Sequence, residues 1–507
     1  MTAPVDSATE AGRPSQRPSQ RPSQRHSHLR TITWVAVIAG LAAAARIPFL
    51  LRPLSPDEGG FLLVASQWTQ GRSLYGDYWV DRPPLLIDFF HLADALGGAL
   101  PLRLLGIGLV ITSVVLAAGV GGVTRGATKL CAATAAVFLV NPLLGVHEID
   151  GELIAVPLIL ASCLGALLSW RSATSGGRAG WLMVSGACGV AAVLVKQNEL
   201  DGLVFLLLAS VTFLRHRQAV WRTLVPAALG GLLLAVLVLA HAASRGTSAS
   251  GLLDAVVTFR FDASAVLKSS ASSATGDRFR TMVLCLVLAG APLIVLQFLM
   301  RLRDKPRSGA PDLRRAVLAV LAWETFSVLG GGSYWLHYLI GLVPGLVLAV
   351  ATLTSSATAE RRPVPRLVIT YAVTACLVAM TTLLARPDLN REDPVITWLQ
   401  AHASSGDTAV VAYGHANYLA ATGLTSPYSE LWSLPVRVRD PDLTALTDVL
   451  RGPARPDWII TGATGSLQSW GIDATLAQPV FDRRYRLVAE LEDRRIYLEV
   501  TQELRTP

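Results

Sequence analysis

Charge is the property that this sequence has least of. Asp, Glu, Lys and Arg make up 16% of its 507 residues, whereas 52% of the residues are hydrophobic. Soluble domains of ordinary composition carry about 25% charged residues. The mean hydropathy of +0.46 comes from apolar runs close to the ~20 residues that a helix needs to cross a bilayer. The composition therefore excludes a soluble protein and predicts a multi-pass membrane protein.

Paired cysteines are lacking as well. All five cysteines lie inside apolar runs and none belongs to a Cys-x-x-Cys pair; they are Cys131, Cys163, Cys188, Cys285 and Cys376. Cysteines in such places are small buried side chains, which excludes a disulfide framework and a cysteine-bound metal. The net charge of +8 resides mostly in short loops between apolar runs, so it indicates membrane topology and no nucleic-acid partner.

Eleven apolar runs predict membrane-spanning helices. They lie near residues 31–51, 101–122, 130–146, 152–170, 180–196, 200–214, 223–243, 281–300, 316–333, 337–354 and 367–385. Before them, residues 1–30 contain Arg-Pro-Ser-Gln three times and little apolar content, which predicts a disordered, basic cytoplasmic tail. The first run ends without a small-residue cleavage site, so we expect a retained helix rather than a signal peptide.

Basic residues occupy alternate loops between these runs. The basic loops hold Arg125 and Lys129, Arg171 and Arg178, Arg215 to Arg222, Arg301 to Arg315, and Arg361 to Arg366, whereas the short loops at 147–151, 197–199 and 334–336 have almost none. Basic loops stay on the cytoplasmic side of a membrane. The alternation predicts a multi-pass protein of the cytoplasmic (inner) membrane with its N-terminus inside. An odd number of spans then puts the C-terminus outside.

Two larger segments fall on the outer side. Residues 52–100 have apolar positions that predict short amphipathic helices at the membrane interface. Residues 386–507 alternate helix and strand patterns, which predicts a small extracytoplasmic α/β domain. Its predicted elements are helices at 394–402, 417–422, 443–450 and 467–478, strands at 408–413 and 458–461, and a closing hairpin of RLVAEL and IYLEV. A third outer loop, 244–280, is rich in Ser, Ala and Gly, a composition typical of mobile loops.

Polar residues gather at one membrane level, the predicted outer face. Asp57 and Glu58 follow the first span. Three later outer turns carry further polar side chains: His147, Glu148, Asp150 and Glu152; Lys196, Gln197, Glu199 and Asp201; and Tyr334, Trp335, His337 and Tyr338. Carboxylates, cations and aromatic rings that meet at the interface suit a site for a charged, sugar-like headgroup whose tail remains in lipid.

Three segments resemble a known family. PDEGG (Pro56 to Gly60) follows the first span, and DRPPLL (Asp81 to Leu86) ends the next loop with a basic residue before Pro-Pro-Leu. This arrangement resembles the GT-C membrane glycosyltransferases that use polyprenyl-phosphate sugars, specifically the relatives of protein O-mannosyltransferases and lipid A aminoarabinose transferases. GGSYWLHYLIGLVPGL (Gly331 to Leu346) resembles a late-helix signature of bacterial members. The resemblance covers residues 31–385 and implies a catalytic membrane domain with its active site in loop 52–100.

The resemblance also implies roles for residues of that loop. Asp57 corresponds to the catalytic residue, and a carboxylate there can take the proton that a sugar hydroxyl loses as it attacks the anomeric carbon. Glu58 either orients Asp57, contacts the acceptor, or is only a favourable charge at a helix N-terminus. Arg82 corresponds to a contact with the donor phosphate, with Asp81 beside it in the substrate site. Relatives often have Lys where this chain has Arg82, and the two side chains differ in geometry.

The later outer turns supply the remaining candidates. Asp150 corresponds best to the second acid of the family and is a candidate substrate contact. Lys196 is a second candidate ligand of the donor phosphate. His337 and Tyr338 are candidate contacts of the donor or the acceptor. An equal alternative for His337 is that it only packs among aromatic rings at the interface.

No metal ligand is assigned, and no cofactor is expected with certainty. A divalent cation stays open as an alternative, because His147 and Glu148 lie near Asp150 in the same outer loop. We expect the partners to be the membrane, a polyprenyl-phosphate sugar donor, and an acceptor glycan, glycolipid or protein. The sequence leaves the sugar and the acceptor open.

Other functions remain alternatives at this point. The main one is a transporter or flippase of lipid-linked sugars, in which Glu324, an acid inside a predicted span, suits either a proton relay or a hydrogen-bonded structural role. The sequence shows no internal repeat of the kind that transporters carry. A non-catalytic scaffold leaves DRPPLL unexplained. An oligosaccharyltransferase with a pyrophosphate-linked donor is the alternative enzyme, although residues 386–507 carry no motif typical of its outer domain.

Overall fold

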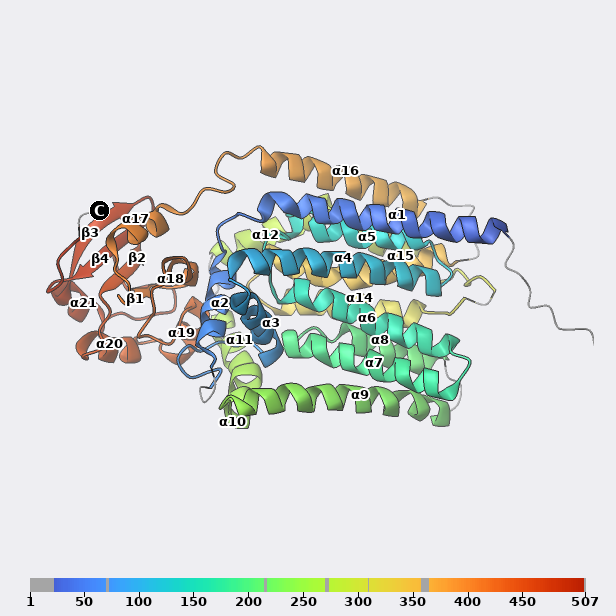
Figure 1. Cartoon of the computed structure of the whole chain (residues 1–507), viewed down its shortest axis with the longest axis horizontal. Coiled ribbons are helices and arrows are strands. Elements are labelled where there is room, and N and C mark those ends of the chain that lie inside the picture. Colours follow the sequence, from blue (N-terminus) through green and yellow to red (C-terminus); the bar gives the residue numbers. More distant parts are fainter. Residues whose placement is uncertain are drawn as a thin grey trace, which may run out of the picture.

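The computed structural model describes residues 22–69, 73–213, 217–269, 273–308, 310–356 and 364–505. They form a helical bundle with a smaller α/β domain at one end and a layer of short helices between the two (Figure 1). Residues 1–21 of the predicted tail and parts of the basic loops at 214–216 and 357–363 lie outside the described residues. Helix α1 (Pro22–Arg46) begins before the predicted edge at residue 31 and so includes the end of the predicted tail.

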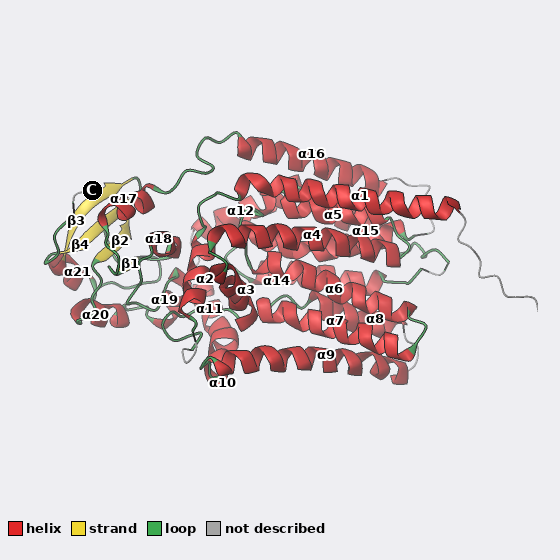
Figure 2. Ribbon diagram, viewed as in Figure 1, coloured by secondary structure: helices red, strands yellow, loops and turns green. Residues whose placement is uncertain are grey.

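Long helices run roughly along one axis of the bundle (Figure 2). After α1 they are α4 (Ala99–Val123), α5 (Thr128–Val140), α6 (Gly151–Arg171), α7 (Ser175–Val195), α8 (Asp201–Phe213), α9 (Arg217–Ser244), α12 (Ser273–Leu288), α13 (Ala291–Met300), α14 (Arg314–Gly330), α15 (Val343–Thr354) and α16 (Val364–Leu384). Short 3-10 turns extend some of them: η1 (Ile47–Phe49), η2 (Pro142–Leu144) and η4 (Leu336–Leu342).

Every predicted span overlaps helical structure, although the span at 281–300 is broken into α12 and α13, and fewer helices qualify as spans by length and apolar composition. In the described residues seven helices qualify, or eight when α12 and α13, which are bent by 66° at their junction, count as one. Gly290 lies at that bend with a φ of +82°, a conformation that glycine adopts readily. The chain is thus a polytopic membrane protein, and the count of eleven spans stays a prediction.

Short helices occupy residues 52–100, the predicted first outer loop. The α/β domain at residues 386–505 is called the outer domain after its predicted side of the membrane, which stays a prediction. α2 (Pro56–Gln67) and α3 (Pro84–Ala95) lie between the bundle and the outer domain (Figure 1). α2 differs from the amphipathic helix that we predict, because every residue from Glu58 to Ala65 is buried. The physical reason is that α3 packs against one side of α2 and α18 (Ala416–Thr422) of the outer domain packs against another.

Much of the third outer loop is helical in the structure. It contains α10 (Ala249–Leu253), the π-helical turn η3 (Asp254–Thr258) and α11 (Phe259–Ser269). α11 packs against α19 (Ser433–Arg439) of the outer domain. A segment whose composition is typical of mobile loops is therefore an ordered part of the interface between the two domains.

The outer domain has the predicted mixture of helices and strands. Its sheet has the order β1 (Ala409–Val411), β2 (Trp458–Gly462), β4 (Arg494–Glu499) and β3 (Tyr485–Leu491). β1 and β2 are parallel, and β4 is antiparallel to both of its neighbours. The helices are α17 (Pro394–His402), α18, α19, α20 (Thr444–Arg451) and α21 (Gln478–Arg484). The closing hairpin is confirmed, whereas α19 is a helix that the sequence pattern does not predict.

The helix predicted at 467–478 is wrong. Residues 467–477 form turns, and α21 begins only at Gln478. Gly471 adopts a φ of +68°, which a right-handed helix does not contain. The Gln468 side chain donates to the Ile472 carbonyl at 2.7 Å and accepts from the Ala474 N–H at 2.8 Å. These side-chain bonds take the place of helical backbone bonds.

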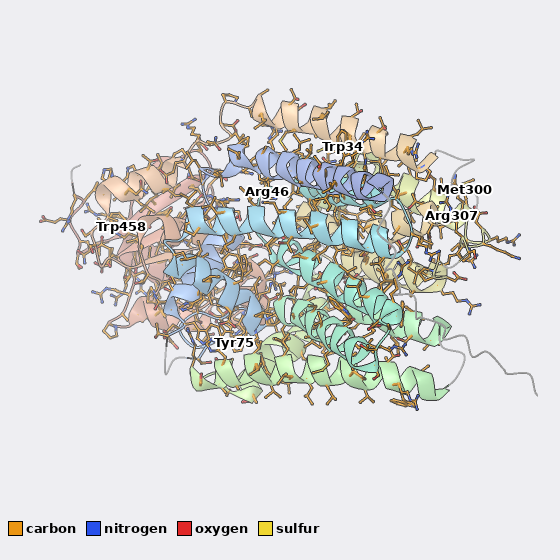
Figure 3. The ribbon with its side chains drawn as sticks, turned by 45° about the vertical axis from the view of Figure 1, so that its right-hand side comes forward. Trp34, Arg46, Tyr75, Met300, Arg307 and Trp458 are labelled. Carbon is orange, nitrogen blue, oxygen red and sulfur yellow. The ribbon has the colours of Figure 1, made fainter. Side chains whose placement is uncertain are left out.

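The bundle end far from the outer domain carries basic loops. Met300 and Arg307 lie at this end, whereas Trp458 lies in the outer domain at the other (Figure 3). Arg125 donates to the Ser308 carbonyl at 3.0 Å, and Arg314 donates to the Leu302 carbonyl at 2.7 Å. The basic side chains thus fix loop backbone at one end of the bundle. The orientation of that end toward the cytoplasm stays a prediction.

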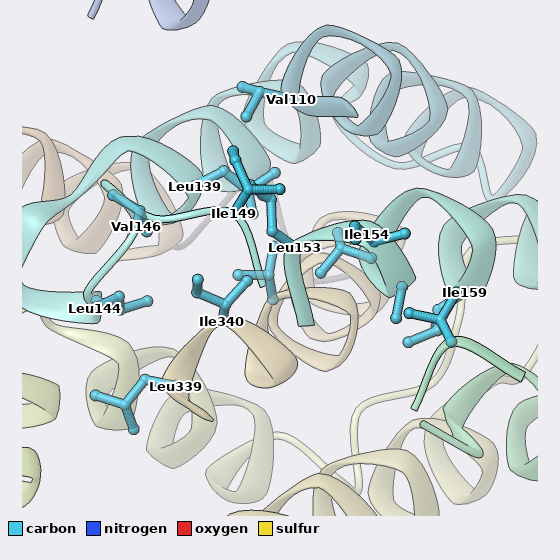
Figure 4. Close-up of a cluster of buried hydrophobic side chains, with 14 of the residues drawn as sticks. Val110, Leu139, Leu144, Val146, Ile149, Leu153, Ile154, Ile159, Leu339 and Ile340 are labelled. Carbon is cyan, nitrogen blue, oxygen red and sulfur yellow. The ribbon is translucent and has the colours of Figure 1, made fainter. Parts of the chain in front are cut away.

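A buried apolar cluster fixes α6 and η4 at the bundle end nearest the outer domain. Ile149, Leu153, Leu339 and Ile340 lie together there (Figure 4), and all are fully buried. Polar residues stand next to them in the sequence, both before α6 and within η4. The apolar cluster therefore fixes the position of the backbone that carries those polar side chains.

Candidate active site

Asp57 and Glu58 are placed by the N-terminus of α2. The Ser55 hydroxyl accepts from the Glu58 N–H at 3.3 Å, and the Glu58 carboxylate accepts from the Ser55 N–H at 3.0 Å. This reciprocal pair is a capping box, which fixes where the helix begins. Pro56 takes the first helical position, where a missing N–H leaves no bond unmade. Asp57 follows, partly exposed, and its Oδ1 accepts from Trp432 Nε1 at 2.9 Å.

Glu58 points into the protein. Its side chain is buried and forms an ion pair with Arg103, with Oε2 and Nη2 2.7 Å apart. Its other oxygen, Oε1, accepts from the Ile149 N–H at 2.7 Å. Both oxygens therefore hold structural partners. These contacts agree with the reading of Glu58 as a helix N-terminal charge, and its catalytic role stays a prediction.

Asp81 joins two arginines beside the site. Arg82 Nη1 lies 2.6 Å from Asp81 Oδ1, and Arg260 Nη2 of α11 lies 2.6 Å from Asp81 Oδ2. Burial raises the pKa of Asp81, but the guanidinium groups of Arg260 and Arg82 outweigh it and hold the pKa below its ordinary value. In the described residues Arg82 bonds to Asp81 through Nη1 alone, so Nη2 is available to an anionic ligand.

Charges link Arg82 with Asp57. Burial lowers the pKa of Arg82, yet the adjacent Asp81 raises it overall, and the charges of Asp57 and Glu152 act in the same direction. The Arg82 guanidinium also lies 5.7 Å from the centroid of the Phe61 ring, which belongs to α2. The first turn of α2 and the end of the outer loop therefore face one site.

A second ion pair joins the outer ends of α6 and α7. Lys196 Nζ donates to Glu152 Oε1, and both side chains are buried. The same ammonium lies 4.6 Å from the centroid of the Tyr338 ring, within the range of a cation–π contact. Attraction between opposite charges is stronger in such a place than in water. Lys196 is therefore held at the site by two partners.

Asp150 faces His337 at the same level. Asp150 Oδ1 caps α6 by accepting from the Leu153 N–H at 2.9 Å. Its Oδ2 is buried and has no hydrogen-bond partner in the described residues. Oδ2 lies 4.0 Å from His337 Nδ1. Burial raises the pKa of Asp150, and the nearby Glu152 adds to the rise.

Asp150, Glu152 and His337 form a group that suits a divalent cation, since each offers one ligand atom and these lie within 4.8 Å of one another. The Glu152 carboxylate already pairs with the Lys196 ammonium, so a divalent cation would compete with that ammonium for Glu152. The predicted set differs, because His147 and Glu148 pair with each other at 3.3 Å. The group that the structure assembles thus takes its histidine from η4.

A cavity of about 1120 Å³ opens beside these residues. Its polar lining includes Arg82, Glu152, Lys196, Arg260 and Tyr338, and its apolar lining includes Leu267, Phe279, Phe326 and Leu329. Phe326 is 64% exposed and Leu329 is 47% exposed, on the outward face of α14. Small-molecule sites commonly measure about 300–1,000 Å³. This cavity can therefore hold a charged headgroup together with the start of an apolar chain.

Three further carboxylates line the cavity: Glu199, Asp201 and Glu324. Glu324 Oε1 accepts from the Gly345 N–H at 2.6 Å, so the acid inside α14 has the hydrogen-bonded role that the sequence leaves open. Its Oε2 and Asp201 Oδ1 are buried without a partner in the described residues. The cavity thus has a carboxylate-rich wall in addition to its cations.

No family model matches the sequence, and no curated protein does. Among solved structures, ArnT from Cupriavidus metallidurans bound to undecaprenyl phosphate has a TM-score of 0.62 at 15% identity, over 92% of this chain and 98% of that chain. The apo state of that ArnT gives 0.62 at 13% identity, with the same coverage. The Archaeoglobus fulgidus oligosaccharyltransferase gives 0.47 at 11% identity, over 88% of this chain and 71% of that chain. The chain has the GT-C fold.

The GT-C fold confirms the resemblance that the sequence motifs indicate. Within this fold, three of the predicted residues line one cavity: Arg82, Lys196 and Tyr338. Asp150 and His337 face each other at the same outer level. The structure therefore brings together side chains from segments that are far apart in the sequence. Asp57 is not among the residues that line the cavity, and Glu58 turns away toward Arg103.

Sequence reasoning missed two residues of this site. Arg260 belongs to Phe-Arg-Phe-Asp in the third outer loop, and an isolated Arg between two aromatic residues is the signal that could have drawn attention to it. Trp432 contacts Asp57 from a position 375 residues away. No local pattern carries that contact, because the folding of the outer domain alone brings the indole to α2.

Proposed function

We propose that this protein transfers a sugar from a polyprenyl-phosphate-linked donor to an acceptor hydroxyl at the outer face of the cytoplasmic membrane. The observation that carries the proposal is the cavity, which has cationic side chains on one wall and exposed apolar side chains on another. A lipid-linked sugar phosphate needs this pair of environments, because its phosphate is anionic and its isoprenoid chain is apolar.

The reaction is a displacement at the anomeric carbon of the donor. The acceptor hydroxyl forms a bond to that carbon, its proton passes to the Asp57 carboxylate, and the bond from the carbon to the phosphate oxygen breaks. Polyprenyl phosphate leaves with the bonding electrons. Arg82, through its available Nη2, and Arg260 stabilise the charge that grows on the phosphate. A single displacement of this kind inverts the anomeric configuration.

The fold supports the donor class. ArnT, which shares the fold over 92% of this chain, is known in a complex with undecaprenyl phosphate. A transporter or flippase of lipid-linked sugars is less favoured, because the polar side chains gather at one end of the bundle. A pump that moves a headgroup across the membrane needs polar groups along the whole path.

The test is to incubate the purified protein with a panel of radiolabelled polyprenyl-phosphate sugars and acceptor extracts. We expect one donor to release polyprenyl phosphate while its label moves to an acceptor. Label that crosses a liposome bilayer with the sugar–phosphate bond intact would identify a flippase instead. Consumption of pyrophosphate-linked donors alone would identify an oligosaccharyltransferase.

A further inference from the structure

The outer domain reaches the first turn of α2 directly. Trp432, which precedes α19, donates from Nε1 to Asp57 Oδ1 at 2.9 Å across 375 residues of sequence. In the described residues this is the hydrogen bond that the Asp57 carboxylate makes. Oδ2 is therefore left to act on a ligand.

The glycines that follow Glu58 allow this approach. A Cβ added to Gly60 would lie 2.3 Å from Trp432 Cζ2, and one added to Gly59 would lie 2.4 Å from Asn417 Cα. Both distances are shorter than any real contact of a Cβ atom. Glycine is unfavourable inside a helix, so its presence at two successive positions of α2 calls for a reason. The close contact of the outer domain supplies that reason.

Independent contacts fix the position of the outer domain. The Trp79 N–H donates to the Ser429 carbonyl at 3.0 Å, and the Ser426 N–H donates to the Tyr78 hydroxyl at 2.9 Å. The Arg439 guanidinium lies 4.5 Å from the centroid of the Trp79 ring. These contacts flank Trp432 in the sequence and attach its segment to the first outer loop. The indole is thus held from both sides.

One aromatic ring connects Trp432 with the phosphate side of the site. The Phe61 ring centroid lies 5.5 Å from that of Trp432, and the Arg82 guanidinium lies 5.7 Å from the same Phe61 ring. A shift of the indole would therefore disturb the packing of Arg82 as well as the hydrogen bond to Asp57.

We propose that the outer domain completes the active site, with Trp432 as the positioning residue of Asp57. This inference rests on the proposed function, in which Asp57 takes the proton of the acceptor. The indole N–H fixes Oδ1, so Oδ2 keeps one direction toward the acceptor. A base that is oriented before the reaction does not lose rotational freedom during it, which raises the rate of the chemical step.

The first test is Trp432→Phe, which keeps an aromatic ring and removes the N–H. We expect kcat to fall about tenfold, while the donor KM stays within about twofold. A purely structural role would instead lower the yield of folded protein and leave the kcat of the folded fraction unchanged. The matched control is Trp458→Phe, which removes an indole bond to Asp407, 2.9 Å long, elsewhere in the outer domain.

The second variant is Gly60→Ala, which keeps the indole but displaces it from α2. It should show a comparable loss of kcat, together with a higher donor KM, because a shifted indole also disturbs the packing of Arg82 through Phe61. Gly108→Ala in α4 is its control, because a Cβ there meets nothing within 4 Å. Wild-type kcat in either folded variant overturns the inference. If Trp432→Phe does not yield folded protein, Gly60→Ala alone decides.

Asp57→Asn separates this inference from the proposed function. If Asp57→Asn keeps wild-type turnover, the assignment of the base fails and the role of Trp432 fails with it. If Asp57→Asn is inactive while Trp432→Phe behaves as wild type, only the role of Trp432 fails. Loss of turnover in Asp57→Asn together with a lower kcat at unchanged donor KM in Trp432→Phe supports both.

Discussion

Neighbouring acids of the first outer loop differ in what their oxygens contact. Glu58 holds Arg103 and the Ile149 N–H, and Asp81 holds two arginines, so both acids are occupied by the protein. In the described residues, only Oδ1 of the Asp57 carboxylate bonds to a protein group, the Trp432 indole. A carboxylate can take a proton from a substrate only with an oxygen that is accessible to it. The contacts therefore favour Asp57 as the base over Glu58 and Asp81.

Replacement of Asp57 by Asn tests the base directly. Asn keeps the shape of the side chain and can still accept from Trp432, but it cannot take a proton. We expect Asp57→Asn to lose about two to four orders of magnitude in kcat while donor binding persists. The measurement is sugar transfer at saturating donor, with Asp94→Asn in α3 as the control. Transfer near the wild-type rate in Asp57→Asn would move the base to Asp150 or Glu58.

Replacement of Arg82 tests the contact with the donor phosphate. Arg82→Ala removes a guanidinium from the leaving-group side, so we expect a higher donor KM and a kcat about 100-fold lower. Arg82→Lys keeps the charge without the planar fork and should retain part of the activity. Steady-state kinetics with varied donor measure both, with the exposed Arg171→Ala as the control. Unchanged donor kinetics in Arg82→Ala would make Arg82 a structural partner of Asp81.

Asp81 should stabilise the protein in a pH-dependent way. Its pKa in the folded protein lies below the ordinary value of 3.8, so its ion pairs add stability above that value and lose it as the pH falls through the folded-state pKa. Asp81→Asn removes the charged partner of two partly exposed guanidinium groups and should cost about 1.5–3 kcal/mol near neutral pH. Thermal unfolding in detergent should show a gap in Tm between wild type and variant that narrows below pH 3.8. Asp262→Asn is the exposed control, and a gap that is constant with pH would contradict the prediction.

At the scale of helices and strands, the sequence predicts most elements well where one rule governs them. The membrane helices follow from apolar length, and each predicted span overlaps helical structure. α17 has its predicted bounds, and the closing hairpin of the outer domain is confirmed. These elements depend on composition and local periodicity alone.

The sequence predicts less well the elements that depend on contacts outside their own periodic pattern. α2 is buried all round because the outer domain covers it, which its own apolar pattern does not reveal. The segment at 467–477 forms turns because of Gly471 and the bonds of the Gln468 side chain. Arg260 enters the site because α11 packs beside the first outer loop. For α2 and Arg260 the deciding contact comes from another part of the chain, so a local pattern could not predict it. The turns at 467–477 depend on side-chain bonds within the segment, which its helical pattern does not reveal.

For the molecule as a whole, the membrane orientation can be tested with fusions. The basic loops lie at the bundle end far from the outer domain, and such loops stay in the cytoplasm. We expect a fluorescent reporter after Arg178 to report the cytoplasm, and alkaline phosphatase after Pro507 to be active outside the membrane. The fluorescent reporter should give no signal after Pro507, and alkaline phosphatase should be inactive after Arg178. A cytoplasmic C-terminus would require an even number of spans and would place the cavity on the inner side.

The shape of the cavity also predicts how the donor enters. Phe326 and Leu329 line it from the outward face of α14, so an isoprenoid chain can pass between the cavity and the lipid at this wall. Phe326→Gln makes the wall polar and should raise KM about tenfold for a long-chain donor, since burial of one such side chain is worth about 1.5–3 kcal/mol. A donor analogue with a short, water-soluble chain should show no change, because it does not reach the wall. Leu318→Gln is the matched control, since Leu318 is 39% exposed on the same helix but does not line the cavity. Equal effects on the long and short donors would mean that the chain leaves the site by another route.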